Sequence, residues 1–515
     1  MEVVENRALL LRVRDGNRIT NVIPKSRVVQ EHSDHDEVLV HWGLEEARVL
    51  KNLKINNVPS PILGQYDWKG IYKPFDHQKT TASFLTLHRK AFCFNEQGTG
   101  KTGSVIWAAD YLMRLGLVRR VLVICPLSIM ESAWRSDLFK FAMHRTVDVA
   151  HGARAKRQEV INSGAEFVVI NFDGVEIVAD DIEKAGFDLI VVDEANAYKN
   201  PSTKRWKVLN HLVKPDTWLW MLTGTPASQS PVDAFGLARL VNPERVPKYI
   251  TAFRDSVMLK VSQFRWVPRP NSEAIVHEAL QPAIRFTKEQ CLDLPEMTYV
   301  MRDVPLTPQQ QKYYDLMRRE MLVNAAGEQI TTVNAAANLN KLLQLSGGAV
   351  YSDTGEVIEF DASNRLNVLK EVIDESSHKV LVFVPYRHAI DIISEALRKD
   401  YTVDVIHGGV SAGKRTQIFE AFQTQPFPRV LVIQPQAASH GVTLHAANTI
   451  VYWSPVMSVE TYLQANARVH RAGQKNKSTV IHLQGSPVER KLYKMLQEKV
   501  DVHTKVVDLY GELLS

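Results

Sequence analysis

Residues 92–102, FCFNEQGTGKT, have the types and the spacing that bind phosphate. A short apolar strand runs into a glycine-containing turn and then into a helix. Gly98 and Gly100 would let the backbone bend around phosphate oxygens, whose charge is favoured by the N–H groups at a helix start. Lys101 would neutralise β- and γ-phosphate charge, and the Thr102 hydroxyl would bind Mg²⁺. The pattern therefore predicts a nucleotide site.

An acid pair follows downstream, at the end of an apolar strand in DLIVVDEAN at 188–196. Asp193 would hold Mg²⁺, directly or through water, and Glu194 would polarise the attacking water as general base. Each motif is weak alone. Asn95 stands where the strict GxxxxGKT form has glycine, so a chance Gly-Lys-Thr turn is one alternative, and acid pairs are common at strand ends. Their combination predicts ATP and Mg²⁺ as cofactors.

Two further elements are candidates for the same site. Gln78, in FDHQKTTASFL, carries an amide that can donate and accept at once and so can pair with the adenine edge. The MLTGTP string at 221–226 places small hydroxyl residues after a buried strand, where they could sense the γ-phosphate or link two lobes. The alternatives are a surface glutamine and a plain turn before a proline.

The string QANARVHRAGQ at 464–474 contains two arginines three residues apart. This spacing puts Arg468 and Arg471 on one helix face or in one turn. Guanidinium groups inserted from a second lobe would stabilise charge on the phosphate being transferred, as arginine fingers do. A solvated basic helix face is the alternative. A phosphate loop and a distant arginine pair together indicate a two-lobed motor.

The elements that must position these residues alternate between strands and helices. From 71 to 240 and again from 365 to 485, apolar strands of four to seven residues are separated by helical segments. This order indicates doubly wound parallel sheets. The predicted fold class is α/β, with two RecA-like parallel-sheet lobes, a helical intervening region and a small β-rich N-terminal domain.

The predicted domains carry the following boundaries: a β-rich accessory domain at 1–70, the ATP-binding lobe at 71–240, a helical insertion at 241–350, the second lobe at 351–490 and a helical tail at 491–515. Within the accessory domain, the apolar runs at 8–13, 19–24, 37–42 and 47–53 predict strands. A threonine and a proline at 307–308 predict the start of an amphipathic helix that reaches residue 322.

Composition excludes several classes of protein. The net charge is +5 and the pI about 8.8, which is mildly basic and permits nucleic-acid binding without proving it. Three cysteines without a CxxC pair argue against structural zinc and fit a reducing compartment. The N-terminus lacks a signal-peptide pattern, and no apolar run reaches transmembrane length. We expect a soluble, monomeric, cytoplasmic protein that is not secreted and has no membrane partner.

Taken in order, the motifs resemble those of the Swi/Snf-related ATPase family of superfamily 2 helicases, over roughly residues 71–500. The resemblance rests on EQGTGKT, VICPLSIMESAW, DEAN, YKNPSTKRWKVL, LTGTP, VIHGG, ASHGVTLHAANTIVYWSP and QANARVHRAGQ. The compact middle and the ASHGVTL string are more similar to phage or prophage members than to chromatin remodellers. A phage-encoded protein would act in the cytoplasm of a bacterial host.

The resemblance implies an ATP-dependent translocase on double-stranded or branched DNA, with other replication or recombination proteins as further partners. Carried over, the nucleotide site comprises Gln78, Gly98, Thr99, Gly100, Lys101, Thr102, Asp193, Glu194, Gly441, Gln464, Arg468 and Arg471. The implied DNA contacts are Ser128, Trp134, Lys199, Ser202, His407, Gly408 and Arg415.

The chain departs from the family pattern at three positions. Asn95 replaces an acid, Thr99 replaces a leucine, and Asn196 stands where His or Gln is usual. Because the carboxylates are intact, we expect an active ATPase. Two other functions stay open: a strand-separating helicase on DNA or RNA, and a nucleotide-gated DNA-binding subunit of a larger assembly.

Overall fold

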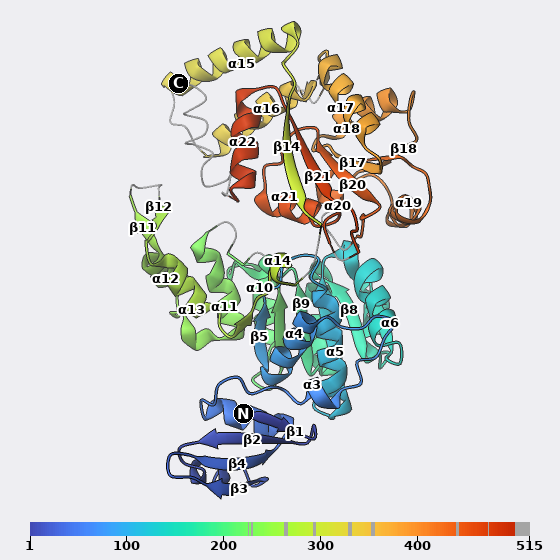
Figure 1. Ribbon diagram of the computed structural model, residues 1–515. Helices are drawn as coiled ribbons and strands as arrows, with labels where there is room; N and C mark the ends of the chain where they lie inside the picture. The colour runs from blue at the N-terminus through green and yellow to red at the C-terminus, as the bar shows by residue number, and fades with distance from the viewer. Residues whose placement is uncertain are drawn as a thin grey trace. The chain divides into compact units, whose positions relative to one another are not determined.

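The computed structural model describes most of the chain as two compact units, residues 1–291 and 292–515. The residues it describes are 1–224, 226–227, 230–261, 266–291, 295–327, 332–351, 356–438, 442–471 and 473–499. For residues 128, 132, 322–327 and 332–334 it describes the backbone alone. Figure 1 shows the elements of both units.

The first unit begins with a small antiparallel sheet in the order β1-β2-β4-β3. Its strands are β1 (Glu2–Val4), β2 (Ala8–Val13), β3 (Ser26–Glu31) and β4 (Asp36–His41). The sheet is joined to the next domain by α2 (Leu44–Asn52), because Arg48 donates to the carbonyl of Thr86 at 2.8 Å and stacks on Trp218. The N-terminal domain is therefore packed against the domain that follows it.

Two segments predicted as strands are helical instead. Residues 19–24 lie in α1 (Asn17–Thr20) and the turn after it, and residues 47–53 lie largely in α2. The buried residues of α2 are Leu44, Ala47 and Leu50, a spacing of three that gathers them on one helix face. The period of the apolar residues, rather than their number, decides the type of element.

The first lobe is a seven-stranded parallel sheet in the order β13-β5-β10-β9-β6-β8-β7. Its strands are β5 (Lys90–Cys93), β6 (Val121–Cys125), β7 (Val147–Ala150), β8 (Phe167–Asn171), β9 (Leu189–Asp193), β10 (Trp218–Leu222) and β13 (Ala283–Ile284). Strands β6, β8 and β10 are buried along their whole length, as apolar strands covered on both faces must be.

Helices cover both faces of this sheet. They are α3 (Ile62–Gln65), α4 (Asp76–Leu87), α5 (Lys101–Arg114), α6 (Ser136–Phe141), α7 (Arg154–Asn162), α8 (Phe172–Ile177), α9 (Ala179–Ala185), α10 (Lys204–Leu212) and α11 (Ala234–Val241). Alternate residues of β6 enter different cores: Val121 and Val123 pack with α4 and α5, while Leu122 and Ile124 pack with α7 to α11. This confirms the prediction of a doubly wound sheet.

Beyond α11 the first unit continues through a helix pair and a hairpin before it returns to the sheet. These elements are α12 (Ile250–Val257), β11 (Met258–Lys260), β12 (Trp266–Pro268) and α13 (Ser272–Ala279). Strand β13 and the short helix α14 (Lys288–Cys291) complete the unit.

The second lobe is a six-stranded parallel sheet in the order β14-β21-β20-β17-β19-β18. Its strands are β14 (Met297–Asp303), β17 (Lys379–Phe383), β18 (Val403–Ile406), β19 (Val430–Ile433), β20 (Ala447–Tyr452) and β21 (Ser478–Gln484). Strand β14 lies inside the stretch predicted as a helical insertion. It pairs with β21 over seven residues, so the second sheet recruits its edge strand from before the helical segment.

The helices of the second unit are α15 (Pro308–Gly327), α16 (Thr332–Ser346), α17 (Ser363–Glu375), α18 (Arg387–Leu397), α19 (Ala412–Thr424), α20 (Pro435–Ala438), α21 (Val459–Asn466) and α22 (Pro487–Gln497), with a hairpin of β15 (Ala349–Tyr351) and β16 (Val357–Glu359). Helix α15 begins where predicted, and the Thr307 hydroxyl accepts from the N–H of Gln310 at 3.3 Å. Most of the predicted tail lies outside the described residues. None of the described helices is long and apolar enough to cross a bilayer.

Candidate active site

The phosphate loop lies between β5 and α5, as the strand–turn–helix pattern predicts. Gly98 and Gly100 have φ of 88° and 77°, in the left-handed region that favours glycine. A Cβ added at Gly100 would lie 2.2 Å from Nε2 of Gln78, so a larger residue would displace the end of that side chain. The two glycines of the motif are therefore required by the backbone path.

Lys101 is the first residue of α5 and is only 9% exposed. Its Nζ donates to the carbonyl of Asn95 at 2.8 Å, which folds the side chain back over the loop. The ammonium, the glycine-rich backbone and the start of a 14-residue helix together present donors and positive potential to one place. Thr102, the next residue, is half-buried and adds a hydroxyl.

Asp193 lies at the same edge of the sheet as the phosphate loop. In the register of the strands it stands opposite Leu222 of β10, which in turn stands opposite Cys93 of β5. Burial and the charge of Glu194 together raise the pKa of Asp193 to about 6, against the opposing effect of Lys101. The lysine and the carboxylate are thus close enough to interact, as groups that hold one Mg–nucleotide must be.

A tryptophan fixes the orientation of this carboxylate. The indole N–H of Trp134 donates to Oδ2 of Asp193 at 3.0 Å, from a π-helical turn at Met130–Arg135 that follows β6. Trp134 is fully buried, with 0% of its surface exposed. The prediction that Trp134 contacts DNA is therefore wrong in this structure, because its indole N–H donates to Asp193 and its side chain is not exposed.

Glu194 is held by the phosphate loop itself. Its Oε1 accepts a hydrogen bond from Nε2 of Gln97 at 2.8 Å. The backbone of Glu194 has φ of 55°, a left-handed conformation that costs a residue with a side chain about 1 kcal/mol or more. Such strain is typical of functional positions, and here it directs the carboxylate toward the loop.

The MLTGTP turn packs directly against the phosphate loop. The N–H of Thr223 donates to the carbonyl of Cys93 at 3.1 Å. A Cβ at Gly224 would lie 3.5 Å from the N of Gln97 and 3.6 Å from the O of Asn95. The turn is therefore adjacent to the loop, while Thr225 lies outside the described residues.

Gln78 braces the phosphate loop in this structure. Its Oε1 accepts from the N–H of Phe75 at 2.9 Å and its Nε2 donates to the carbonyl of Gly100 at 3.1 Å. The side chain is only 6% exposed. Both ends of the amide thus contact protein groups, and the adenine contact stays a prediction.

One part of the site was not predicted from the sequence. The segment 282–288 runs beside β5 and onto the loop, since Phe92, Phe94 and Glu96 donate their N–H groups to the carbonyls of residues 282, 284 and 286. The only signal in the sequence is a short apolar stretch after a proline. It becomes recognisable as a strand only through its partner.

Asn95 joins this segment to α4. Its Nδ2 donates to the hydroxyl of Thr81 at 2.8 Å, and its Oδ1 accepts from the N–H of Phe286 at 3.0 Å. Because the Thr81 hydroxyl donates its own proton to the carbonyl of His77, position 95 must supply a donor to it. An amide provides one donor and one acceptor, which an aspartate does not, and this explains the departure from the family pattern.

In the second unit, the predicted arginines lie in the turn that follows α21. Arg468 is buried, and its carbonyl accepts from the N–H of Leu444 at 2.9 Å. Arg471 donates to the carbonyl of Val442 at 3.2 Å. These two bonds connect the arginine turn to the loop at residues 442–444. Gly441 lies outside the described residues.

Gln464 of α21 is 7% exposed and donates to the carboxylate of Glu460 at 3.2 Å. Gln474 was not among the predicted site residues, although it closes the same motif. Its Nε2 donates to the carbonyls of His445 and Ala447 at 3.2 and 2.9 Å and so holds the arginine turn against β20. The geometry gives Gln474 a positioning function.

The predicted DNA contacts of the first lobe are separated by the structure. Lys199 forms an ion pair with Asp233 at 3.1 Å, and Ser202 is held by the side chain of Asn200 in the turn before α10. Only the backbone of Ser128 is described, in a 3-10 turn at Leu127–Ile129. Lys199 and Ser202 share one loop, and Trp134 is buried elsewhere.

The predicted DNA contacts of the second lobe do meet. His407 and Gly408 form the loop after β18, and Arg415 of α19 donates to the carbonyls of both, at 3.3 and 3.0 Å. A third bond joins Nε of Arg415 to the carbonyl of Val410 at 2.8 Å. Arg415 therefore braces this loop. The N–H groups of Gly408, Gly409 and Val410 are themselves bonded within the protein, to Gln434 and to His407. The contact of this loop with DNA stays a prediction.

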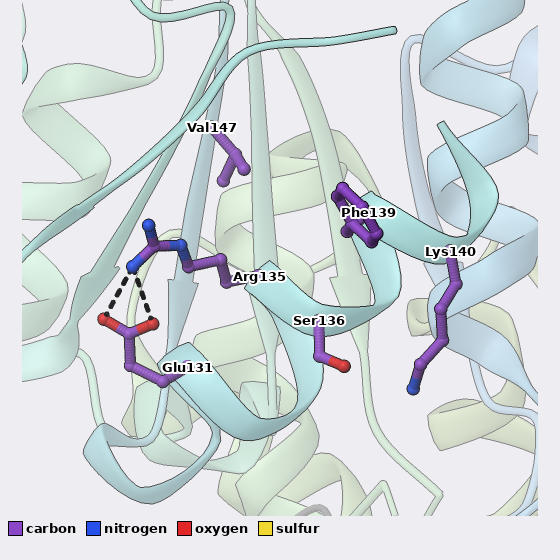
Figure 2. A pocket seen from close by; sticks show the side chains of 6 residues that line it. All are labelled: Glu131, Arg135, Ser136, Phe139, Lys140 and Val147. Atoms are coloured by element: carbon purple, nitrogen blue, oxygen red, sulfur yellow. Dashed lines mark hydrogen bonds and ion pairs between the residues drawn. The ribbon is translucent and has the colours of Figure 1, made fainter. Parts of the chain in front are cut away.

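A surface pocket on α6 is separate from these residues. Figure 2 shows that it is lined by Glu131, Arg135, Ser136, Phe139, Lys140 and Val147. Glu131 and Arg135 form an exposed ion pair at 3.1 Å across it. None of the lining residues belongs to the phosphate loop or the acid pair.

The comparisons with known proteins agree with this geometry. The chain matches the SNF2-related domain over residues 67–347 and the helicase conserved C-terminal domain over residues 364–473. Chromodomain-helicase-DNA-binding protein 1-like from Mus musculus is 26% identical over 477 residues, which cover 88% of this chain and 52% of that protein. The chain thus spans about half the length of this relative.

Two other similar proteins are a phage protein and an archaeal structure. Protein p41 of Acyrthosiphon pisum secondary endosymbiont phage 1 is 24% identical, over 77% of this chain and 88% of that protein. The Sulfolobus solfataricus SWI2/SNF2 ATPase core in complex with dsDNA is 21% identical, with a TM-score of 0.42 over 87% of this chain and 95% of that one.

A parallel-sheet lobe with a phosphate loop and an acid pair, followed by a second parallel-sheet lobe, defines a helicase-class ATPase. The SNF2-related model alone matches more than half of the residues, and the chain belongs to the SNF2-related family. Enzymes of this class use ATP, generally with Mg²⁺. The donor set at the first sheet edge fits that pair: an ammonium and helix N–H groups for phosphate, a hydroxyl and a carboxylate for the metal.

Proposed function

We propose that this protein is an ATP-dependent translocase on double-stranded or branched DNA. The observation that carries the proposal is the convergence of Lys101, Asp193 and Glu194 at one sheet edge of a chain in the SNF2-related family. The name of the mouse relative contains helicase and DNA-binding, which favours DNA as the partner. Such movement would remodel forks, migrate branches or displace bound proteins.

In this mechanism the loop N–H groups and Lys101 bind the phosphates, while Thr102 and Asp193 hold Mg²⁺. Bound Mg–ATP supplies the phosphoanhydride bond whose hydrolysis releases the energy for movement. Glu194 accepts a proton from the attacking water. Gln97 keeps the Glu194 carboxylate aimed at the loop through its 2.8 Å bond.

The second lobe completes the site in this proposal. Arg468 and Arg471 stabilise the charge that develops on the transferred phosphoryl group, Gln464 and Gly441 contribute from the same lobe, and Gln78 contacts adenine. The DNA contacts are phosphate contacts by loops that include Ser128, Lys199, Ser202, His407, Gly408 and Arg415, because most protein–DNA hydrogen bonds are made to the backbone.

The test is steady-state ATP turnover without nucleic acid and then with single-stranded DNA, blunt duplex, a four-way junction and RNA. We expect strong stimulation by duplex or junction DNA, and loss of turnover in Lys101→Ala and Glu194→Gln variants whose thermal unfolding is unchanged. Unchanged turnover in Lys101→Ala contradicts the phosphate-loop assignment.

The same experiment separates the alternatives. Stimulation by single strands or RNA alone supports a strand-separating helicase. DNA binding with no turnover on any nucleic acid supports a nucleotide-gated subunit of a larger assembly.

A further inference from the structure

The hairpin between α12 and α13 lies in a basic segment of the chain. Residues 244–269 contain six lysines and arginines against two acids, a net charge of +4 in a chain whose total is +5. Strands β11 and β12 pair in the register Met258↔Pro268, Leu259↔Val267, Lys260↔Trp266. Figure 1 shows the hairpin extending from the end of α12 at the margin of the first unit.

Two cations gather on one aromatic ring in this hairpin. The guanidinium of Arg254 lies 4.7 Å from the ring centre of Trp266, and Nζ of Lys260 lies 5.9 Å from it. The ring attracts each cation, while the two like charges held at one ring repel each other. An anion between them would relieve that repulsion.

The protein does not supply this anion. Among the described residues no carboxylate forms an ion pair with Arg254 or Lys260, and Nε of Arg254 is buried with no hydrogen-bond partner. Other basic residues nearby are already used: Arg245 pairs with Glu278, and Arg269 donates to the carbonyls of Asp255 and Met258. Among the described residues, no carboxylate therefore neutralises Arg254 of α12 or Lys260 of β11 at the Trp266 ring.

A second cation–aromatic pair precedes α12. Nζ of Lys248 lies 5.5 Å from the ring centre of Tyr249, and Tyr249 is 65% exposed. Helix α12 has eight residues, so its ends are about 12 Å apart at about 1.5 Å per residue. A DNA strand advances about 3.4 Å per nucleotide, so about three to four nucleotides match the length of α12.

We propose that α12 and the β11–β12 hairpin form a DNA-binding surface of the first lobe, in which Lys248, Arg254 and Lys260 contact backbone phosphates. A group of cations that have no carboxylate partner in the described part of the chain, held beside the half-buried Trp266 and the exposed Tyr249, fits a polyanion. This inference rests on the proposed function, since it names a further surface for the same DNA.

The experiment measures the affinity of the full chain for a fluorescein-labelled blunt duplex by anisotropy, at several salt concentrations. Lys260→Glu and Lys248→Glu are compared with Lys184→Glu, an equal change of charge at an exposed lysine of α9. We expect each hairpin variant to bind about tenfold more weakly, and the Lys248→Ala/Lys260→Ala double variant to lower the slope of log K against log salt by about 2.

The outcomes distinguish the two proposals. Hairpin variants that bind like Lys184→Glu, while the unaltered chain binds duplex, overturn this inference and leave the proposed function standing. An unaltered chain that binds no duplex overturns the proposed function. If Lys260→Glu lowers the unfolding temperature, Lys248→Gln tests the same surface from outside the hairpin, with an expected fall in the salt slope of about 1.

Discussion

Asp193 owes its orientation to a donor that lies 59 residues earlier in the chain. The indole N–H of Trp134 donates to Oδ2, and the N–H of Glu194 donates to Oδ1 at 3.0 Å, so both carboxylate oxygens are held in place. Partners of metal ligands in the second layer commonly change metal affinity or activity by about 10–100-fold when removed. Trp134 is therefore a positioning residue for the proposed Mg²⁺ ligand.

We expect Trp134→Phe, which keeps a ring and removes the N–H, to raise the Mg²⁺ concentration needed for half-maximal ATP turnover about tenfold. The KM for ATP at saturating Mg²⁺ should change little. Trp107→Phe is the matched control, because its buried N–H donates instead to the carbonyl of Lys69. An equal Mg²⁺ requirement in the two variants contradicts the role of Trp134.

The identities of Lys101, Asp193 and Glu194 could be predicted from the sequence, because each lies in a short motif with its own chemistry. Trp134 could not be placed in the same way. Its neighbours in the chain suggest a DNA-facing loop, and only the parallel packing of β6 beside β9 brings the π-helical turn to the acid. Residues that meet because they lie at the ends of different strands have no characteristic spacing in the sequence.

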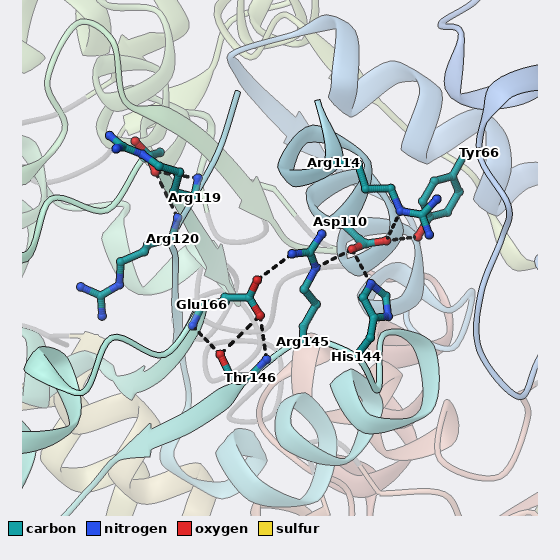
Figure 3. A network of polar contacts seen from close by, with 10 residues as sticks. Tyr66, Asp110, Arg114, Arg119, Arg120, His144, Arg145, Thr146 and Glu166 are labelled. Carbon is teal, nitrogen blue, oxygen red and sulfur yellow. Dashed lines mark hydrogen bonds and ion pairs between the residues drawn. The ribbon is translucent and has the colours of Figure 1, made fainter. Parts of the chain in front are cut away.

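At the scale of elements, the phosphate-loop helix is anchored far from its first residue. Figure 3 shows Asp110 of α5 with Tyr66, His144, Arg145 and Arg114 around it. Arg145 donates to it at 2.6 Å and continues to Glu166 at 2.6 Å. This network joins α5 to the chain before α4 and to the start of β7, so the helix that carries the phosphate loop is fixed at both ends.

Asp110→Asn should lower the free energy of unfolding by about 3 kcal/mol, because it removes a buried charge from paired cations. Burial alone would raise the pKa of Asp110, but hydrogen bonds from Tyr66 and Arg145 hold it below its ordinary value. Its contribution is therefore complete above the unfolded pKa of about 3.9 and is lost as pH falls through the lower folded pKa.

Denaturant unfolding at pH 7 and at pH 3 measures this effect. Asp216→Asn, at a fully exposed ion pair with Arg89, is the control and should change stability by less than about 0.5 kcal/mol. If Asp110→Asn is no more damaging than this control at pH 7, the network does not anchor α5.

The alternation of strands and helices predicted both parallel sheets, because buried parallel strands are recognisable as apolar runs. Strand β14 was missed because none of its residues is fully buried and because its partner β21 lies 181 residues away, in the register Thr298↔Thr479. The segment 47–53 was wrongly predicted as a strand, because seven residues are too few to distinguish an apolar spacing of three from a spacing of two.

At the scale of the whole molecule, the proposed chemistry is divided between two units that are separate in the chain. The phosphate loop and the acids belong to the first unit, and the arginine turn belongs to the second. Under the proposed function, hydrolysis would require residues of both lobes, whereas nucleotide binding would require mainly those of the first.

Arg471→Ala should therefore spare ATP affinity and depress kcat by about 10³-fold, the scale on which arginine fingers act. Equilibrium binding of a fluorescent ATP analogue and DNA-stimulated turnover measure the two effects. Arg490→Ala, an exposed arginine of α22 paired with Asp303, is the control. A collapse of ATP affinity with unchanged kcat rules out the finger role.

Under the proposed function, the segment 282–288 would connect mechanical load to the nucleotide site. It lies near the end of the first unit, and the second unit begins at residue 292. Its N–H groups donate hydrogen bonds to the side chains of Asn95 and Glu96 in the phosphate loop. In the proposed translocase, a pull along the chain toward this segment would act on its bonds to Asn95 and Glu96. If a translocase of this kind were stopped by an obstacle on its DNA, the load would act at its nucleotide site.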